Sequence, residues 1–244
     1  TELADPQDRR YGYPFINCTQ CGPRYTLIES LPYDRPNTSM AGFPLCADCE
    51  QEYRDPKDRR FHAEPVACPV CGPRLSFERR DCDTITESGD ALSAAVDAIH
   101  SGEVVAVKGI GGYHLVCDAR SAAAVAELRR RKARPDKPLA VMFPLGGSDG
   151  LEFVRREAEL HAVEADLIAG PVRPNVLARK QDNGTLADTR APGLGEIGEF
   201  LPYSPLHQLL QDEFGGPVVA TSGNISGEPV LTDNEEAAER LAAS

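Results

Sequence analysis

The 244-residue sequence has no tryptophan, and only 6% of its residues are aromatic. It has no apolar run near the roughly 20 residues that a membrane-spanning helix needs, and no signal-peptide pattern opens it. Its net charge of −12 argues against non-specific binding to nucleic acid, which depends on a basic face that neutralises phosphates. We therefore expect a cytoplasmic protein with a modest core and neither a membrane nor a nucleic acid as partner.

Cysteine, in contrast, is abundant. Six of the eight cysteines fall in three Cys-x-x-Cys pairs, and in a cytosolic chain this spacing indicates metal ligands rather than disulfides. Cys46, Cys49, Cys68 and Cys71 supply four thiolates from two knuckles. This is the pattern of a structural zinc site with no position left open for catalysis. We predict that these four residues bind Zn²⁺.

The N-terminal third of the sequence contains an internal repeat. Residues 2–11 match residues 52–61, and residues 18–24 match residues 68–74, in each case 50 positions later. Two copies of one small unit are therefore expected side by side. We interpret the Asp-Arg-Arg of each copy as an ion-paired scaffold, because a module of this size has little core of its own.

The repeat also makes Cys18 and Cys21 metal-ligand candidates. The equivalents of the other two ligands would precede Thr1, so the first unit looks truncated and we expect the natural chain to begin earlier. An alternative pairs Cys18 and Cys21 with Cys46 and Cys49. The repeat favours the first arrangement, but the sequence leaves both open.

From residue 90 onward, helix and strand patterns alternate, which predicts an α/β domain. Helices are predicted at 90–100, from 121 to just before Pro135, and at 157–168, 204–214 and 234–243. Strands are predicted at 103–108, 113–117, 139–143, 170–178 and 217–220. We take His207, on one of these helices, as a packing or surface residue, because no acid–base partner is evident for it.

One basic segment is conspicuous in this acidic chain. Six of the nine residues from Arg129 to Lys137 are cationic, and they lie between the end of a helix and the start of a strand. Pro135 and Pro138 force extended backbone there, so that Lys132, Arg134 and Lys137 can converge on an anion. The alternative is a solvated basic helix end that the helix dipole favours.

Further candidates for an anion site lie elsewhere in the sequence. The segment from Thr221 to Pro229 follows an apolar strand and consists mainly of small hydroxyl, amide and glycine residues, which offer hydrogen-bond donors to an anion. Lys108 ends a strand at a glycine turn, and Arg173 lies at the mouth of another strand. Both could direct a cation toward a ligand.

Together, the runs Lys-x-Arg-Pro-x-Lys-Pro at 132–138 and Thr-Ser-Gly-Asn-x-Ser-Gly at 221–227 resemble the YrdC/Sua5 family, whose members form acyl-adenylates from ATP and a carbamate. The resemblance implies a twisted mixed sheet with helices and a nucleotide pocket lined by Lys132, Arg134, Ser222 and Asn224. It further implies binding of ATP with Mg²⁺. The full set of nucleotide-binding candidates is Lys132, Arg134, Lys137, Arg173, Thr221, Ser222, Asn224 and Ser226, and the catalytic candidates are Lys132, Arg134 and Lys108.

Over nearly its whole length, the sequence is similar to the HypF family of hydrogenase maturation carbamoyltransferases. The runs that carry this resemblance include residues 8–18, 58–62, 111–118 and 201–207. It implies a zinc-finger module at 1–77 with a truncated first unit, a connector at 78–90, and a YrdC-like domain at 91–244 that is cut at its C-terminal end.

The HypF resemblance also implies a reaction and partners. ATP and carbamoyl phosphate would be the substrates, carbamoyl-adenylate the product of this domain, and HypE the partner of a C-terminal domain that this sequence lacks. Two alternatives stay open. One is threonylcarbamoyl-adenylate synthesis for tRNA modification, and the other is a non-catalytic zinc-knuckle docking module.

Overall fold

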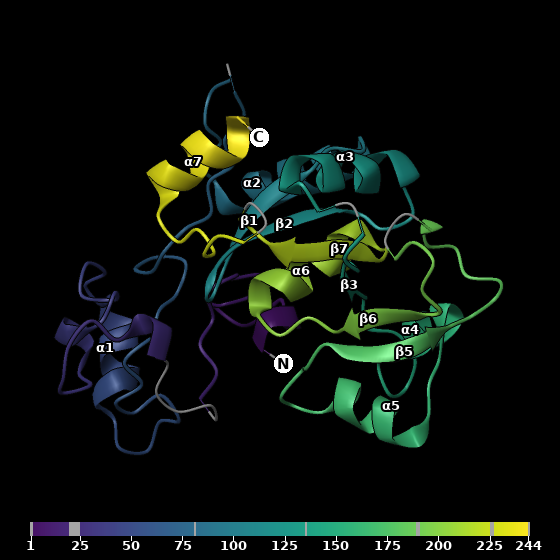
Figure 1. The fold of residues 1–244 in the computed structure, drawn as a ribbon. Coiled ribbons are helices and arrows are strands. Elements are labelled where there is room, and N and C mark those ends of the chain that lie inside the picture. Colours follow the sequence, from purple (N-terminus) through teal and green to yellow (C-terminus); the bar gives the residue numbers. More distant parts are fainter. Residues whose placement is uncertain are drawn as a thin grey trace.

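A seven-stranded mixed sheet forms the centre of the structure, a computed structural model that describes residues 2–19, 25–80, 82–134, 136–188, 191–224 and 227–243. The strand order is β1-β2-β7-β3-β6-β5-β4. The strands are β1 (Val105–Gly109), β2 (Gly112–Asp118), β3 (Val141–Met142), β4 (Ala158–Glu159), β5 (Val176–Lys180), β6 (Glu196–Phe200) and β7 (Val218–Ser222). Figure 1 shows helices on both sides of this sheet.

The helices are α1 (Ala47–Arg54), α2 (Ser88–His100), α3 (Ala122–Lys132), α4 (Glu152–Glu157), α5 (Ala162–Ala169), α6 (Pro205–Phe214) and α7 (Asn234–Ala243). Apolar residues of α2 and α6 pack on one face of the sheet, and those of α3, α4 and α5 pack on the other. Among the described residues, short 3₁₀ helices lie at Glu2–Ala4, Tyr25–Leu27 and Arg35–Asn37. Within the described ranges, no helix has both the length and the apolar character that crossing a membrane requires.

The pairing of β7 with its neighbours determines where the loop after Ser222 lies. β7 lies between β2 and β3 and is antiparallel to both, whereas β3 and β6 form a parallel pair. The prediction of an α/β fold with a mixed sheet is therefore confirmed. The end of β7 lies beside the start of β2, so the loop that follows Ser222 adjoins the β1–β2 hairpin.

The structure differs from the sequence prediction at 157–168. Instead of one solvated helix, α4 ends at Glu157, and the next two residues form β4 along the edge of β5. Glu157 is buried, and its carboxylate accepts hydrogen bonds from the amides of Thr185 and Leu186. A carboxylate that is satisfied inside the fold has no reason to lie on a solvated helix face, which is where amphipathic spacing placed it.

In the N-terminal part, the two repeat copies exchange ion pairs. Arg10 Nη1 donates to Glu52 Oε1 (3.1 Å), and 50 positions later Arg60 Nη1 donates to Glu2 Oε1 (3.0 Å). Both arginines are almost completely buried. Burial alone would raise the pKa of Glu52, but the hydrogen bonds and charges of Arg10 and Arg9 outweigh it and lower this pKa to about 2. Each copy thus satisfies the buried cation of the other.

This reciprocity predicts the effect of removing one carboxylate. Glu52→Gln is expected to lower the free energy of unfolding of the N-terminal segment by about 1–3 kcal/mol, because the buried Arg10 loses its anionic partner. Glu50→Gln is the matched control, since Glu50 pairs with Arg54 on the surface and exposed pairs contribute little. Thermal unfolding of both variants measures the difference. Equal midpoints would show that the exchanged pair does not stabilise the segment.

Candidate functional site

Four cysteines converge beside α1. Cys46 precedes that helix and Cys49 lies within it, whereas Cys68 and Cys71 belong to one turn. Their Sγ atoms all lie within 4.8 Å of one another, and Cys68 Sγ is 3.7 Å from the Sγ atoms of both Cys46 and Cys71. A tetrahedral ion with bonds of about 2.3 Å to sulfur separates its ligand atoms by about 3.8 Å. The cluster therefore fits a zinc ion held by four thiolates.

Two arginines cover this cluster. Arg9 Nη2 and Arg10 Nη2 lie 3.2 Å and 3.5 Å from Cys49 Sγ and donate to it. Four thiolates around a divalent ion leave an excess of negative charge, which these guanidinium groups offset. The Asp-Arg-Arg of the first copy thus reaches the thiolate cluster of the second, a contact between copies that the sequence did not reveal.

Two further metal-ligand candidates were predicted, Cys18 and Cys21. Cys18 is exposed and outside the group of four, and Cys21 is outside the described residues. Because Cys46 and Cys49 group with the later Cys-x-x-Cys pair, the alternative pairing of Cys18 and Cys21 with them is not the arrangement in the structure. Metal binding by Cys18 and Cys21 stays a prediction of the repeat.

The second candidate site joins α3 to the end of β7. Ser121 caps α3 through its Oγ, which accepts from the amide of Ala124 (3.2 Å), and the helix ends at Ala133 in the left-handed region (φ 48°). The resulting turn directs Lys132 inward, where only 2% of its surface is exposed. Lys132 Nζ donates to the carbonyl of Ser222 and, at 3.0 Å each, to the carbonyl and side-chain oxygens of Asn224.

These contacts have two consequences for Lys132. An ammonium group has three N–H donors, and all three are used on Ser222 at the end of β7 and on Asn224 in the loop that follows, so that Lys132 fixes the shape of this loop. Burial, together with the nearby charge of Arg134, lowers the pKa of Lys132 to about 8. The group is thus charged at neutral pH but loses its proton under mildly alkaline conditions.

Arg134 has donor capacity left. Its Nη2 donates to the carbonyl of Pro138 (3.0 Å), but its Nε is buried without a hydrogen-bond partner among the described residues. Burial lowers the pKa of this guanidinium. A buried unpaired donor is costly, and an anionic ligand would satisfy it. The exposed side chain of Lys137 lies three residues further along the same turn.

Arg129 holds this turn together, a role that the sequence analysis missed. Its Nη1 donates to the carbonyls of Arg134 (2.8 Å) and Lys137 (3.0 Å). In a run of six cations, nothing in the sequence distinguishes the one that folds back on the backbone from those that face a ligand. Arg129 therefore fixes the shape of the turn before any ligand binds, and the turn presents the other cations to a ligand.

The loop after β7 is itself ordered by hydrogen bonds. Ser222 Oγ donates to Asn224 Oδ1 (2.6 Å), and the amide nitrogen of the Asn224 side chain donates to the carbonyl of Glu228. Thr221 lies one residue earlier, in register with Leu115 on β2. Ser226 is outside the described residues.

Lys108 lies at the same end of the sheet, with β2 between it and β7. It is paired with Tyr113, whose carbonyl accepts from the amide of Gly223 (2.6 Å). Its exposed amine donates to Asn234 Oδ1 (2.6 Å) and stands 5.8 Å from the ring centroid of Tyr113. Lys108 therefore borders the loop after β7, although no contact described joins it to Lys132 or Arg134.

Arg173 lies elsewhere. It precedes β5 with a left-handed backbone (φ 51°), and its Nη1 donates to the carbonyl of Ile168 (3.2 Å). β5 begins beside the end of β6, which is level with the end of β3 and the start of β7. Because Ser222 ends β7, Arg173 lies toward the opposite end of the strands. The structure does not bring it together with the other candidates.

A histidine–tyrosine cluster adjoins Ser222. His114 is the register partner of Ser222 on β2, Tyr203 precedes α6, and His207 lies in the first turn of that helix. The rings of His114 and His207 stack with centroids 5.4 Å apart, and the Tyr203 hydroxyl is 3.3 Å from His114 Nε2. Burial, helped by the neighbouring His114, lowers the pKa of His207 to about 4. The buried, stacked ring of His207 fits the expectation of a packing residue, but the sequence did not reveal its partner His114, which lies on a distant strand.

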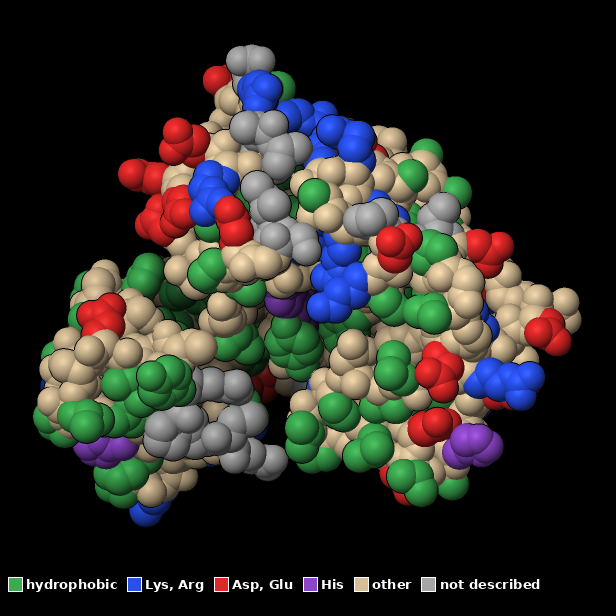
Figure 2. Space-filling view, viewed as in Figure 1, with side chains coloured by type: hydrophobic (Ala, Val, Ile, Leu, Met, Phe, Trp, Pro, Cys, Tyr) green, Lys and Arg blue, Asp and Glu red, His purple; other side chains and the backbone are tan. Residues whose placement is uncertain are grey.

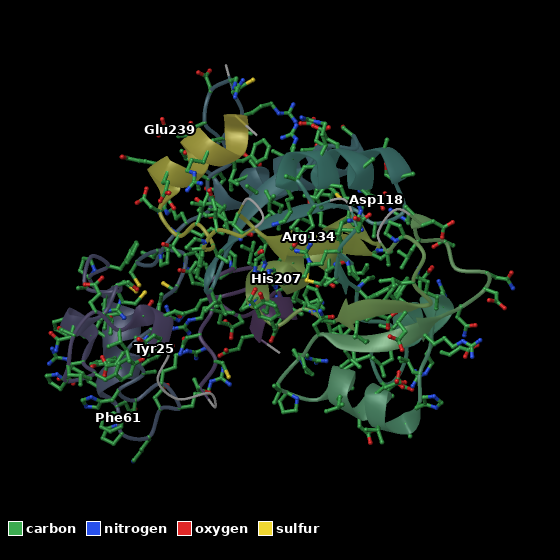
Figure 3. The ribbon with its side chains drawn as sticks, in the orientation of Figure 1. Tyr25, Phe61, Asp118, Arg134, His207 and Glu239 are labelled. Atoms are coloured by element: carbon green, nitrogen blue, oxygen red, sulfur yellow. The ribbon has the colours of Figure 1, made fainter. Side chains whose placement is uncertain are left out.

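The figures show where this region lies. Figure 3 labels Arg134 and His207 near the centre of the view, on segments that approach from different sides of the sheet. In Figure 2, histidine atoms form part of the floor of a hollow at the centre of this face, with Lys and Arg atoms beside it. A separate cavity of about 720 Å³ lies between β5 and residues 191–195, and none of the predicted site residues is part of its described lining.

Comparison with known families defines the class of protein. The model of the Sua5/YciO/YrdC family, described as telomere recombination, matches residues 97–244. The model of the HypF finger matches residues 1–28 and 45–78. The first match covers more than half of the chain, so the chain belongs to the Sua5/YciO/YrdC family. The predicted boundaries at 77, 78, 90 and 91 stay predictions.

Within that family, the chain is similar to carbamoyltransferase HypF over nearly its whole length. HypF of Synechocystis sp. is 51% identical over 241 residues, which are 99% of this chain and 31% of that protein. The crystal structure of full-length HypF in its phosphate- and nucleotide-bound form has a TM-score of 0.89 and 49% identity, covering 98% of this chain and 30% of that one. The predicted resemblance to HypF and the YrdC/Sua5-like fold are confirmed.

Similarity to the alternative relatives is more limited. Threonylcarbamoyl-AMP synthase of Mus musculus is 34% identical over 149 residues, which are 60% of this chain and 51% of that protein. The chain spans just under a third of the length of the HypF relatives, so the activities of those longer proteins are not thereby those of this segment.

The cysteine geometry leads to a metal prediction. The purified chain is expected to contain at least one zinc ion, and Cys68→Ser is expected to release it and unfold the N-terminal segment, because zinc binding contributes directly to folding at such sites. Cys82→Ser is the matched control, since Cys82 is exposed and outside the cluster. Elemental analysis and circular dichroism provide the two measurements. A folded chain without zinc would contradict the assignment.

Proposed function

We propose that residues 91–244 form carbamoyl-adenylate from ATP and carbamate, and that residues 1–77 form a zinc-stabilised module joined to them by a connector at 78–90. The observation that carries this proposal is the contact of Lys132 with the loop after β7, across 90 positions of the sequence. It joins the two motifs for which a common nucleotide pocket was predicted. The similarity to a HypF whose structure is nucleotide-bound supports it further.

The reaction needs positioning and charge neutralisation more than covalent chemistry by the protein. A carbamate oxygen attacks the α-phosphorus of ATP, the bond from that phosphorus to the bridging oxygen breaks, and pyrophosphate leaves. Charge is conserved without transfer of a proton. Mg²⁺ enters with ATP as part of the substrate.

Each member of the site has a distinct task in this proposal. Arg134 donates from its unpaired Nε to the phosphates, for which a guanidinium is well suited. Lys132 supplies charge and holds the loop, so that Ser222 and Asn224 lie at the reacting end. Thr221, Lys137 and Ser226 are proposed to contact the nucleotide, and Lys108 to lie near the carbamate. Arg173 stays a sequence-based candidate without support from this geometry.

The longer HypF relatives suggest the wider context. Hydrolysis of carbamoyl phosphate to carbamate, and transfer of the carbamoyl group toward HypE for the cyanide ligand of nickel-iron hydrogenase, would take place in parts of a longer protein. The HypF finger match favours this over threonylcarbamoyl-adenylate synthesis, since the similarity to the Mus musculus synthase covers 60% of the chain. A docking module without catalysis would not need the buried, unpaired donor of Arg134.

The first test concerns Arg134. Arg134→Ala is expected to weaken ATP·Mg²⁺ binding tenfold or more, because each charge-assisted contact contributes roughly 1.5–3 kcal/mol. Arg130→Ala is the matched control, since Arg130 is exposed near the same helix end and pairs with Glu127. Calorimetric titration measures both affinities. Equal affinities of the two variants for ATP would show that the nucleotide does not bind at this turn.

The lowered pKa of Lys132 predicts a pH dependence. Below about pH 8 the buried amine is charged, and above that value the folded chain loses this charge. Bound ATP favours the charged form, so ATP binding takes up a proton and its affinity falls as the pH rises through this range. In Lys132→Gln this dependence is expected to disappear. Calorimetry in buffers of different ionisation enthalpy measures the proton uptake, and identical pH profiles would exclude Lys132 as its source.

The substrate itself is tested by exchange of labelled pyrophosphate into ATP. Ammonium carbamate is expected to support exchange, whereas threonine with bicarbonate is not, because threonylcarbamate adds a carboxylate that needs its own donors. A longer protein that contains this segment is expected to give the same preference with carbamoyl phosphate. The reverse preference would favour the tRNA-modifying alternative.

A further inference from the structure

The histidine–tyrosine cluster has a feature that packing does not explain. His207 is 98% buried and His114 is half-buried, and the Nδ1 atoms of both rings have no hydrogen-bond partner in the part of the chain that the structure describes. Buried polar atoms are normally paired, and each exception needs a reason. At position 114, a phenylalanine ring would fill the same space without this cost.

The missing partner leaves the proton position of His114 free. In most histidines, a fixed bond at one ring nitrogen decides which nitrogen carries the proton. His114 Nδ1 has no such hydrogen bond. This edge of the imidazole ring lies over Gly109, and a Cβ atom at position 109 would approach within 3.3 Å of the ring. His114 Nε2 can therefore either donate or accept. The only hydrogen-bond partner described for His114 Nε2 is the hydroxyl of Tyr203, which can also either donate or accept.

The cluster lies next to the proposed reaction centre. His114 and Ser222 are direct register partners on antiparallel strands, so their side chains start about 5 Å apart on the same face of the sheet. That face is covered by α6, which carries His207. Lys132 reaches the carbonyl of Ser222 from α3, which packs on the opposite face. Ser222 thus lies between a cationic side and a neutral side.

The cationic side and the neutral side of Ser222 match the two substrates, ATP and carbamate, respectively. A triphosphate needs cations. Carbamate is a small planar acid with two acceptor oxygens and an amino group that donates, so it needs neutral groups able to play both roles. Because burial lowers the pKa values of His114 and His207, both rings stay neutral at physiological pH.

We propose that His114 Nε2 and the Tyr203 hydroxyl hold the carbamate during adenylation, and that His207 is a positioning residue that fixes the ring of His114 by stacking. The long contact between His114 and Tyr203 (3.3 Å) is exposed and can open to admit a ligand between its two partners. This inference rests on the proposed adenylation and adds the residues that select the acid.

The test uses carbamate-dependent exchange of pyrophosphate into ATP by the whole chain, with ammonium carbamate as the probe. His114→Phe and Tyr203→Phe keep the rings but remove the polar atoms, so each is expected to raise the KM for carbamate about tenfold and to leave the Kd for ATP within twofold. His207→Phe keeps the stacking and is expected to change the KM less than threefold, whereas His207→Ala is expected to raise it. His100→Phe is the matched control, because the ring of His100 contacts that of Phe214 at the end of α6 remote from His207.

A measurement on the unmodified chain complements the variants. Nitrogen-15 spectra of the histidine rings are expected to show a shift of the His114 signals when ammonium carbamate is added in the presence of ATP, with those of His100 unchanged. Exchange that proceeds with wild-type KM in His114→Phe and Tyr203→Phe would overturn this inference and leave the proposed function intact. Absence of ATP binding and of any exchange in the wild-type chain would overturn the proposed function instead.

Discussion

The structure of the site depends on one buried amine. Lys132 ends α3, and its three N–H donors are all used on Ser222 at the end of β7 and on Asn224 in the loop that follows, so that two segments 90 positions apart become one unit. A charge in such a place is unfavourable, as the lowered pKa of Lys132 shows. The fold accepts this cost because the carbonyls of the loop are satisfied in return.

The same principle operates in the N-terminal part, where charge is shared between repeat copies. Arg10 and Arg60 each reach across to a carboxylate of the other copy, and Arg9 and Arg10 also face the thiolate cluster. A module this small has little apolar core, and its two core clusters contain few residues. Buried ion pairs, together with the metal that the four cysteines fit, would supply the stability that apolar packing does not.

Much of the architecture could be predicted from the sequence, because cysteine spacing, the repeat and alternating apolar segments are local signals. Side-chain direction could not. The run of cations from Arg129 to Lys137 gives the same signal for a residue that braces the turn, such as Arg129, as for one with an unpaired donor, such as Arg134. The location of Arg173 could not be predicted for a related reason: a cation at the mouth of a strand can lie at either end of a sheet, and strand order decides which.

His207 shows the limit most clearly. A histidine on a helix face is ordinary, and its meaning here comes from His114 on β2, beside Ser222. Three long-range pairings, of β2 with β7, of α6 with the sheet and of Lys132 with the loop, are needed before these residues form a single site. The first two pairings are set by burial of apolar faces, whereas the third is made by the hydrogen bonds of Lys132 itself. His114 and His207 are therefore placed by a core whose sequence carries no information about their chemistry.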